Sequence, residues 1–175
     1  MEFYLHRKTF VHNVHLQIKT IFAEKYKIMI QRIQTVFVLV AEMLIASLFF
    51  LKFADLSVNG ELYTFTINGI FNGETMVFDG LPIMIFTGLI LFLHLVIILM
   101  YKKRVLQIRI LVFSIILLFG LFGMFFYFTY AGFTGAQVAF KVPVAFPVIA
   151  VILDYLAIRA IGKDEALVRS MDRIR

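Results

Sequence analysis

Four long apolar stretches of about twenty residues each dominate this chain, and short polar segments separate them. A helix rises about 1.5 Å per residue, so each stretch is long enough to cross a hydrocarbon core roughly 30 Å thick. Only helices can cross singly, because an isolated strand would leave its backbone polar groups unpaired in lipid. The expected spans are residues 36–53, 81–100, 110–130 and 142–161.

The composition agrees with a membrane protein. Hydrophobic residues make up 62% of the 175 residues and the mean hydropathy is +0.94, whereas roughly 45–50% apolar is usual for a soluble domain. The spans and their connections fill residues 29–175, so we expect one four-span membrane domain and no separate soluble module. The absence of Cys excludes disulfides, thiolate metal sites and cysteine nucleophiles.

The basic residues predict the orientation. Every Lys and Arg except Lys52 and Lys141 precedes the first span, lies between the second and third spans, or follows Ala157 at the end of the fourth. Loops rich in Lys and Arg stay in the cytoplasm, so we expect a multi-pass protein of the cytoplasmic (inner) membrane with both termini inside. The net charge of +6 is explained by this topology, and we expect no nucleic-acid partner.

The first outer loop, residues 54–80, carries four acids and no Lys or Arg. Its β-branched and aromatic residues alternate around Asn68-Gly69 and Asn72-Gly73, and Asn-Gly is typical of tight hairpin turns. The expected fold is therefore an all-α membrane protein: an antiparallel bundle of four transmembrane helices with a small extracytoplasmic β-hairpin between the first two.

The C-terminal segment 163–175 places acids at its start and Arg at its end, an arrangement that the helix dipole favours. We expect a short cytoplasmic helix there. Its Arg side chains would meet anionic lipid headgroups, or the helix would dock a cytoplasmic partner.

Three ionisable residues interrupt the spans: Glu42, His94 and Asp154. Counted from the cytoplasmic end of each span, all three lie at about one depth. Charged groups in hydrocarbon cost at least about 2.5–3.5 kcal/mol on the insertion scale, so they face the bundle interior and pair. One interpretation is a proton-linked or cation-binding site, another is a structural polar latch, and a further one is that the three residues make no contact. Asp154 has one more option, because a long side chain at Arg159 can reach it.

No catalytic motif is present. The chain has no GxSxG, HExxH or Walker-type element, and its histidines lack carboxylates at metal-ligand spacing. We therefore expect no enzymatic activity, no cofactor and no bound metal.

Two cytoplasmic motifs resemble a known family. MIQRIQT at residues 29–35 and RAIGKDEALVRSMDRIR at residues 159–175 are similar to the ends of the domain of unknown function family 4293, an uncharacterised four-span inner-membrane family of Bacteroidota. The resemblance implies a membrane and a source lineage, and it implies no activity or catalytic residue. Members of this family begin at the equivalent of Met29, so residues 1–28 are interpreted as an N-terminal extension or a start codon assigned too far upstream.

The expected function is that of an accessory or scaffold subunit of a membrane assembly. The alternative is a small proton-coupled transporter or channel built around the intramembrane acids and histidine. The expected partners are the lipid bilayer and another membrane or cytoplasmic protein. The candidate contacts for a cytoplasmic partner or lipid are Arg32, Arg159, Arg169 and Arg173.

Overall fold

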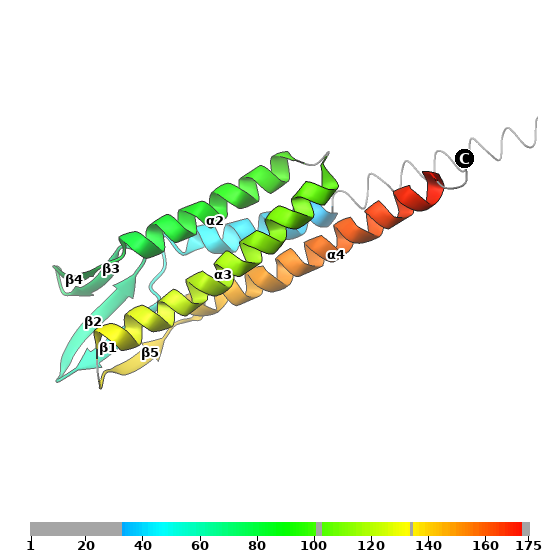
Figure 1. Cartoon of the computed structure of the whole chain (residues 1–175). Coiled ribbons are helices and arrows are strands. Elements are labelled where there is room, and N and C mark those ends of the chain that lie inside the picture. The colour runs from blue at the N-terminus through cyan, green and yellow to red at the C-terminus, as the bar shows by residue number, and fades with distance from the viewer. Residues whose placement is uncertain (1–32, 101–102, 134, 173–175) are drawn as a thin grey trace, which may run out of the picture.

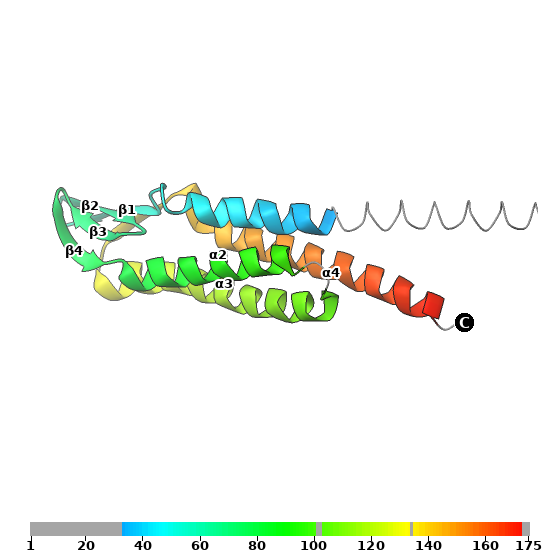
Figure 2. The same cartoon turned by 90° about the horizontal axis from the view of Figure 1, so that it is seen from above.

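The computed structural model of the chain describes residues 33–100, 103–133 and 135–172. It shows an elongated molecule in which helices lie side by side and a small sheet covers one end of them (Figure 1). The helices are Ile33–Ser47, α2 (Leu81–Leu99), α3 (Arg104–Gly132) and α4 (Phe146–Asp172), with a 3-10 turn η1 (Val142–Ala145) before α4. Successive helices alternate in direction, as Figure 2 shows from above.

Three helical segments are long and apolar enough to cross a membrane: Leu81–Leu99, Arg104–Gly132 and Val142–Ala166. The Ile33–Ser47 helix is shorter, so the span expected at 36–53 is not helical over its last residues. After Ser47 the backbone tightens into a turn in which the Phe50 amide donates to the Ser47 carbonyl at 3.0 Å. The chain then becomes extended, and the Phe53 amide bonds the Phe65 carbonyl at 2.8 Å. The Ile33–Ser47 helix ends before the predicted boundary because the backbone of Phe53 pairs with the sheet.

The sheet has five antiparallel strands in the order β4-β3-β2-β1-β5. Four of them form a meander in the first outer loop: β1 (Ala54–Val58), β2 (Glu61–Thr66), β3 (Gly69–Asn72) and β4 (Thr75–Asp79). The fifth, β5 (Gln137–Phe140), comes from the loop after α3 and pairs with β1. The sheet therefore joins two loops that are distant in sequence.

Asn-Gly dipeptides set the tight turns of the meander. Asn59 and Gly60 have φ angles of 53° and 87°, the positive pair that a type I′ hairpin requires. Gly69 has a φ of 137°, and a Cβ there would overlap the backbone oxygen of Phe78. Gly80 lies against it, and its amide donates to the Asn68 carbonyl at 3.0 Å. The base of the meander is thus a backbone-to-backbone contact that only glycine allows at these two positions.

The expected all-α fold with a single β-hairpin is wrong, because the described residues also contain this five-stranded sheet. The alternation of apolar residues in the first outer loop predicted one hairpin, whereas the loop forms four strands. The strand β5 is only four residues long, too short to stand out next to an apolar span. It forms because β1 offers it an open edge, and this pairing is not local in sequence.

The hydrophobic core runs from the helices into the sheet. Its larger cluster joins buried residues of the helices, such as Ile90 and Phe125, to Phe53 and Phe65 of the sheet region. The rings of Phe53 and Phe125 lie 4.5 Å apart between centroids. A smaller cluster, at the helix ends away from the sheet, contains Val38, Ile97, Leu111, Ala157 and Ile161. The sheet is therefore packed firmly onto the helices.

Candidate functional site

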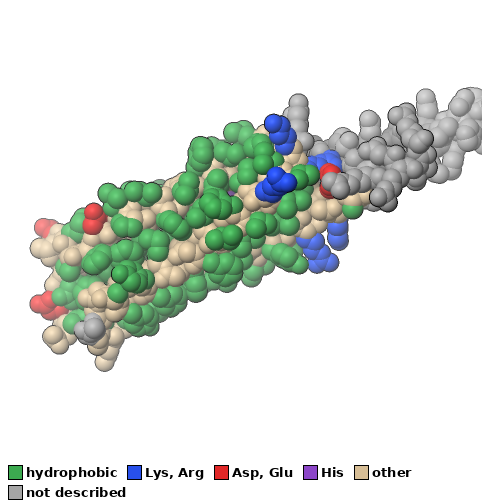
Figure 3. All heavy atoms as spheres, viewed as in Figure 1, with side chains coloured by type: hydrophobic (Ala, Val, Ile, Leu, Met, Phe, Trp, Pro, Cys, Tyr) green, Lys and Arg blue, Asp and Glu red, His purple; other side chains and the backbone are tan. Residues whose placement is uncertain are grey.

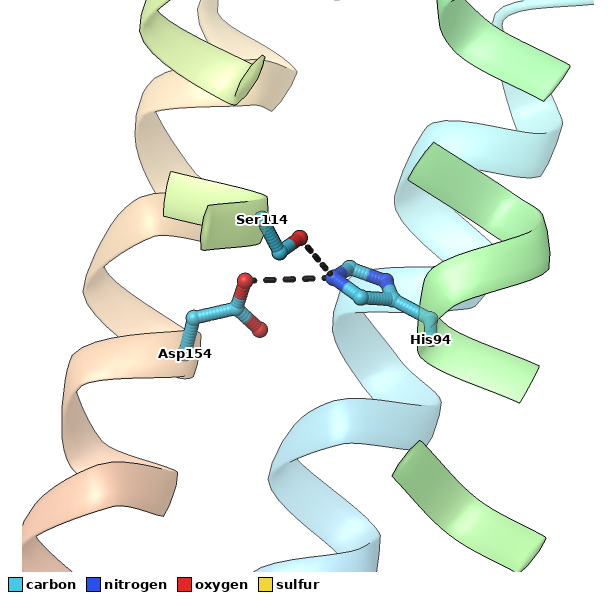
Figure 4. A network of polar contacts seen from close by, with 3 residues as sticks. All are labelled: His94, Ser114 and Asp154. Carbon is cyan, nitrogen blue, oxygen red and sulfur yellow. Dashed lines mark hydrogen bonds and ion pairs between the residues drawn. The ribbon is translucent and has the colours of Figure 1, made fainter. Parts of the chain in front are cut away.

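A buried polar cluster joins α2, α3 and α4 near the junction of the two apolar clusters (Figure 4). It consists of His94, Ser114 and Asp154, each with no exposed surface, and we call it the His–Ser–Asp cluster. The His94 Nε2 atom lies 3.1 Å from Asp154 Oδ2 and 2.8 Å from Ser114 Oγ. One imidazole nitrogen thus links three helices.

Helical periodicity brings these side chains inward. His94 lies one turn from Ile90 and from Ile97, and Ser114 lies one turn from Leu111 and from Leu118. All four of these apolar residues are buried. Asp154 stands in the same way between Ala150 and Ala157. Residues at these spacings share one helix face, so the polar side chains occupy positions in the core stripe of each helix.

The cluster does not have the geometry of a hydrolytic triad. In such a triad the carboxylate holds one imidazole nitrogen while the serine uses the other. Here Ser114 and Asp154 approach the same nitrogen. Within the described residues, His94 Nδ1 and Asp154 Oδ1 have no hydrogen-bond partner, and no group of three or more His, Cys, Asp or Glu side chains could hold a metal ion. The arrangement can share protons and bind helices together.

The structure brings together His94 and Asp154 from the predicted set, and it leaves Glu42 outside. Glu42 is half-buried on the Ile33–Ser47 helix and forms no hydrogen bond or ion pair with another described residue. Ala41, its neighbour, occupies the core position instead, with no exposed surface. Consecutive residues of a helix point about 100° apart, so Glu42 points away from the core face that Ala41 occupies. Its similar depth in the membrane therefore did not bring it to His94 and Asp154.

Ser114 is the member that sequence reasoning missed, because a single hydroxyl in a span is usually bonded to its own helix. Its level can be found once a single contact between α3 and α4 is known. Ser114 follows Arg104 by as many residues as separate Asp154 from Asp164, and Arg104 pairs with Asp164 at 2.8 Å between Nη2 and Oδ2. In antiparallel helices, matched separations from one contact put Ser114 and Asp154 at the same level.

A second polar layer lies toward the helix ends away from the sheet. It contains Gln34, Gln107 and Asp164, all buried, each about one turn beyond the smaller apolar cluster. Gln107 Nε2 donates to the Ile97 carbonyl at 2.8 Å and so satisfies an otherwise free carbonyl near the end of α2. Gln34 Nε2 has no partner within the described part of the chain. We call the layer, together with its Arg104 pair, the basic-end polar layer.

Most of the described basic side chains lie at one end of the molecule. The end of the helices opposite the sheet, which we call the basic end, carries exposed or half-exposed Lys103, Arg104, Arg109, Arg159 and Lys163. On the face seen in Figure 3, blue Lys and Arg atoms gather there. Red acidic atoms lie at the sheet, and a smaller red area lies beside the blue atoms. Of the predicted partner contacts, Arg159 is exposed on α4, while Arg32, Arg173 and the side chain of Arg169 lie outside the described residues.

The comparisons with known proteins identify a family. No curated protein and no solved structure matches the chain at a significant level. Residues 30–174 match the family described as Domain of unknown function (DUF4293), which confirms the family resemblance drawn from the two cytoplasmic motifs. Because this match covers most of the sequence, the chain belongs to the DUF4293 family.

Proposed function

We propose that this chain is an integral protein of the cytoplasmic membrane, without catalytic activity, that serves as an accessory or scaffold subunit of a membrane assembly. We propose further, from the family resemblance, that the source belongs to the Bacteroidota. In this proposal the helices lie in lipid, the sheet stands on the outer face and the basic end lies in the cytoplasm.

The surface of the helices supports a lipid environment. Large apolar side chains are exposed along them, including Phe92 at 60%, Phe113 at 50% and Ile116 at 60%. Contiguous apolar surface of this kind marks contact with a membrane or a partner. The excess of Lys and Arg at the basic end, compared with only Lys52 and Lys141 at the sheet end of the described residues, supports the orientation. Basic residues that flank spans remain in the cytoplasm.

The closed His–Ser–Asp cluster is the observation that carries the scaffold function. Its three side chains are fully buried, and the buried side chains one turn away from them on each helix are apolar. In lipid there is no hydrophobic force between helices, so packing and interhelical hydrogen bonds must hold them together. The cluster fits a latch that keeps the helices in one arrangement while the two ends meet partners.

Cross-linking in native membranes tests this proposal. A photoreactive amino acid at Arg159, on the exposed surface of the basic end, should give one discrete cross-linked protein. The matched control is the same amino acid at Leu95, which is 48% exposed between the helix ends and should label lipid. Cross-links to lipid only at both positions, together with purification of the native protein as a single chain, would contradict a scaffold subunit.

A proton-coupled transporter or channel is the second candidate. It is favoured by the two buried atoms, His94 Nδ1 and Asp154 Oδ1, that have no partner among the described residues. Reconstituted vesicles decide between the candidates, since a transporter moves protons or a coupled solute across the bilayer and a scaffold moves neither.

A further inference from the structure

We infer that the His–Ser–Asp cluster binds one exchangeable proton, and that this proton comes from and returns to the compartment at the basic end. The inference uses the membrane placement in the proposed function but requires no partner protein. It goes beyond that function by giving the latch a ligand and a direction of access.

The contact between His94 and Asp154 requires a proton. If neither Nε2 nor Oδ2 carried one, two lone pairs would face each other at 3.1 Å. One proton therefore lies between these atoms. With that proton only, the pair is a neutral imidazole and a carboxylate, with a net charge of −1 in the apolar interior.

A second proton makes the pair neutral. Its position follows from the first contact, because Nε2 and Oδ2 already share one proton. Whether the pair is imidazolium with carboxylate or imidazole with carboxylic acid, one of the two remaining atoms carries a hydrogen. These atoms, His94 Nδ1 and Asp154 Oδ1, are the ones without a partner in the described residues. They are the atoms at which a proton can be added or removed without breaking the cluster.

The route to the cluster is shorter from the basic end. At about 1.5 Å per residue, α2 continues roughly 8 Å past His94 to Leu99 but extends about 20 Å back to Leu81 at the sheet. Along α3, Ser114 is about 15 Å from Arg104 and about 27 Å from Gly132. Along α4, Asp154 is about 12 Å from Phe146 and about 15 Å from Asp164, so this helix does not discriminate. The larger differences along α2 and α3 favour exchange with the basic end.

The side chains along the two routes differ in the same sense. Toward the basic end, the smaller apolar cluster is followed by the basic-end polar layer, where Gln34 Nε2 is an unpartnered buried donor within the described region. Toward the sheet lies the larger apolar cluster. Its buried hydroxyls already donate to their own helices, Thr87 to the Ile83 carbonyl at 2.8 Å and Thr129 to the Phe125 carbonyl at 2.7 Å. No relay is visible on that side of the described structure.

Other charged groups on the helices packed around the cluster are few. Glu42 is half-buried on the Ile33–Ser47 helix, and α2 contains no titratable residue besides His94. The remaining titratable and charged side chains that the structure describes on α3 and α4 are Arg104, Arg109, Tyr127, Tyr130, Tyr155, Arg159, Lys163, Asp164 and Glu165.

A rise in pH at the basic end removes the second proton and leaves a buried negative charge, so the latch weakens as that pH rises.

Nuclear magnetic resonance of ¹⁵N-histidine in vesicles tests the inference. His6, His12 and His15 are replaced by Asn in the full chain so that His94 gives the histidine signal. The orientation in each preparation is measured with an impermeant maleimide on Glu74→Cys, at the sheet, and on Lys163→Cys, at the basic end. The His94 signal should follow a change of pH on the basic-end side. It should stay constant when the pH on the sheet side changes, and Asp154→Asn should remove the response.

A matched pair of variants tests the route. Leu111 and Leu118 are both fully buried on α3, one turn on either side of Ser114, so truncation to Ala leaves similar cavities. Leu111→Ala should speed the response of His94 to a pH jump at the basic end several-fold, and Leu118→Ala should not. A His94 signal that follows the sheet side, a signal that never responds, or equal acceleration by both variants would overturn the inference. The maleimide pattern reports the membrane orientation independently, so a failure of the proposed function is recognised separately.

Discussion

The helices and the sheet differ in where they hold their polar side chains: the helices bury a polar cluster, whereas the sheet keeps its acids at the surface. In the helical part the buried side chains include His94, Ser114 and Asp154, while Phe92 is 60% exposed. In the sheet Leu56 and Phe65 are buried, while acids stand on the surface. There Glu61 accepts hydrogen bonds from Tyr63 Oη at 3.0 Å and Asn72 Nδ2 at 2.7 Å, and the bond from Tyr63 raises the pKa of that phenol. One chain is thus built for two solvents.

The ion pairs of the two regions also differ in how much they contribute to stability. Asp55 and Lys141 pair at 2.7 Å in the sheet region with about two-fifths of each side chain exposed, at 42% and 40%. Water competes for such a pair, which contributes about 0–1 kcal/mol. His94 and Asp154 pair with no exposure, so breaking their contact strands a polar group in the interior. The effect of losing a pair on stability thus depends more on its burial than on the distance between its atoms.

The largest expected effect is the loss of one member of the His–Ser–Asp cluster. His94→Leu should lower the stability of the folded protein by about 3–5 kcal/mol, because it leaves Asp154 buried without its partner. Replacing His94, Ser114 and Asp154 together by apolar residues of similar size should recover much of that loss. Thermal unfolding in detergent, followed by circular dichroism, measures both variants. A triple variant as unstable as His94→Leu would contradict a latch whose cost lies in an unpaired charge.

A lysine placed on the surface of a helix or of the sheet tests whether the two regions face different solvents. Leu95 of α2 is 48% exposed and Val77 of β4 is 49% exposed, so exposure is matched. Leu95→Lys should cost about 2.5–3.5 kcal/mol in membrane insertion, because its charge would lie in hydrocarbon. Val77→Lys should change stability by less than about 0.5 kcal/mol. Insertion efficiency and yield of folded protein measure both. Equal tolerance at the two positions would show that α2 does not face lipid.

The backbone contact at the base of the sheet offers a third comparison. Gly69→Ala should cost on the order of 2–3 kcal/mol, because the new Cβ meets the Phe78 carbonyl and the φ of 137° is unfavourable for Ala. Gly60→Ala is the matched control, since its φ is 87° but no atom lies within 4 Å of the added Cβ. Its cost should be only about 1–2 kcal/mol. Protection of sheet amides from hydrogen exchange reports the difference, and equal losses would argue against the close approach.

The smallest effect is expected at the exposed pair in the sheet region. Asp55→Asn should lower stability by no more than about 1 kcal/mol, and salt should reduce the difference from the unmodified chain. Thermal unfolding at low and high ionic strength checks this. A loss of stability as large as that of His94→Leu would contradict the distinction between the exposed ion pair of the sheet and the buried pair of the helices.

Much of the candidate site could be read from the sequence, and the errors have physical causes. His94 and Asp154 were predicted as partners because ionisable groups in an apolar span must pair. Glu42 was included on depth, but depth does not tell which way a helix faces, and Ala41 has the core position. Ser114 was not predicted, because a hydroxyl in a helix usually bonds its own backbone. Only the packing of α3 against α2 and α4 gives it an outside partner.

Local chemistry by itself determined the long apolar helices Leu81–Leu99, Arg104–Gly132 and Val142–Ala166, the separation of charge to alternate gaps and the Asn-Gly turns. Each depends on residues that are neighbours in the chain. The tertiary structure decided where the first helix ends, how β5 completes the sheet and how one nitrogen of His94 meets both Ser114 and Asp154. These features depend on contacts between distant segments, whose free energy appears only when the helices and the sheet pack together.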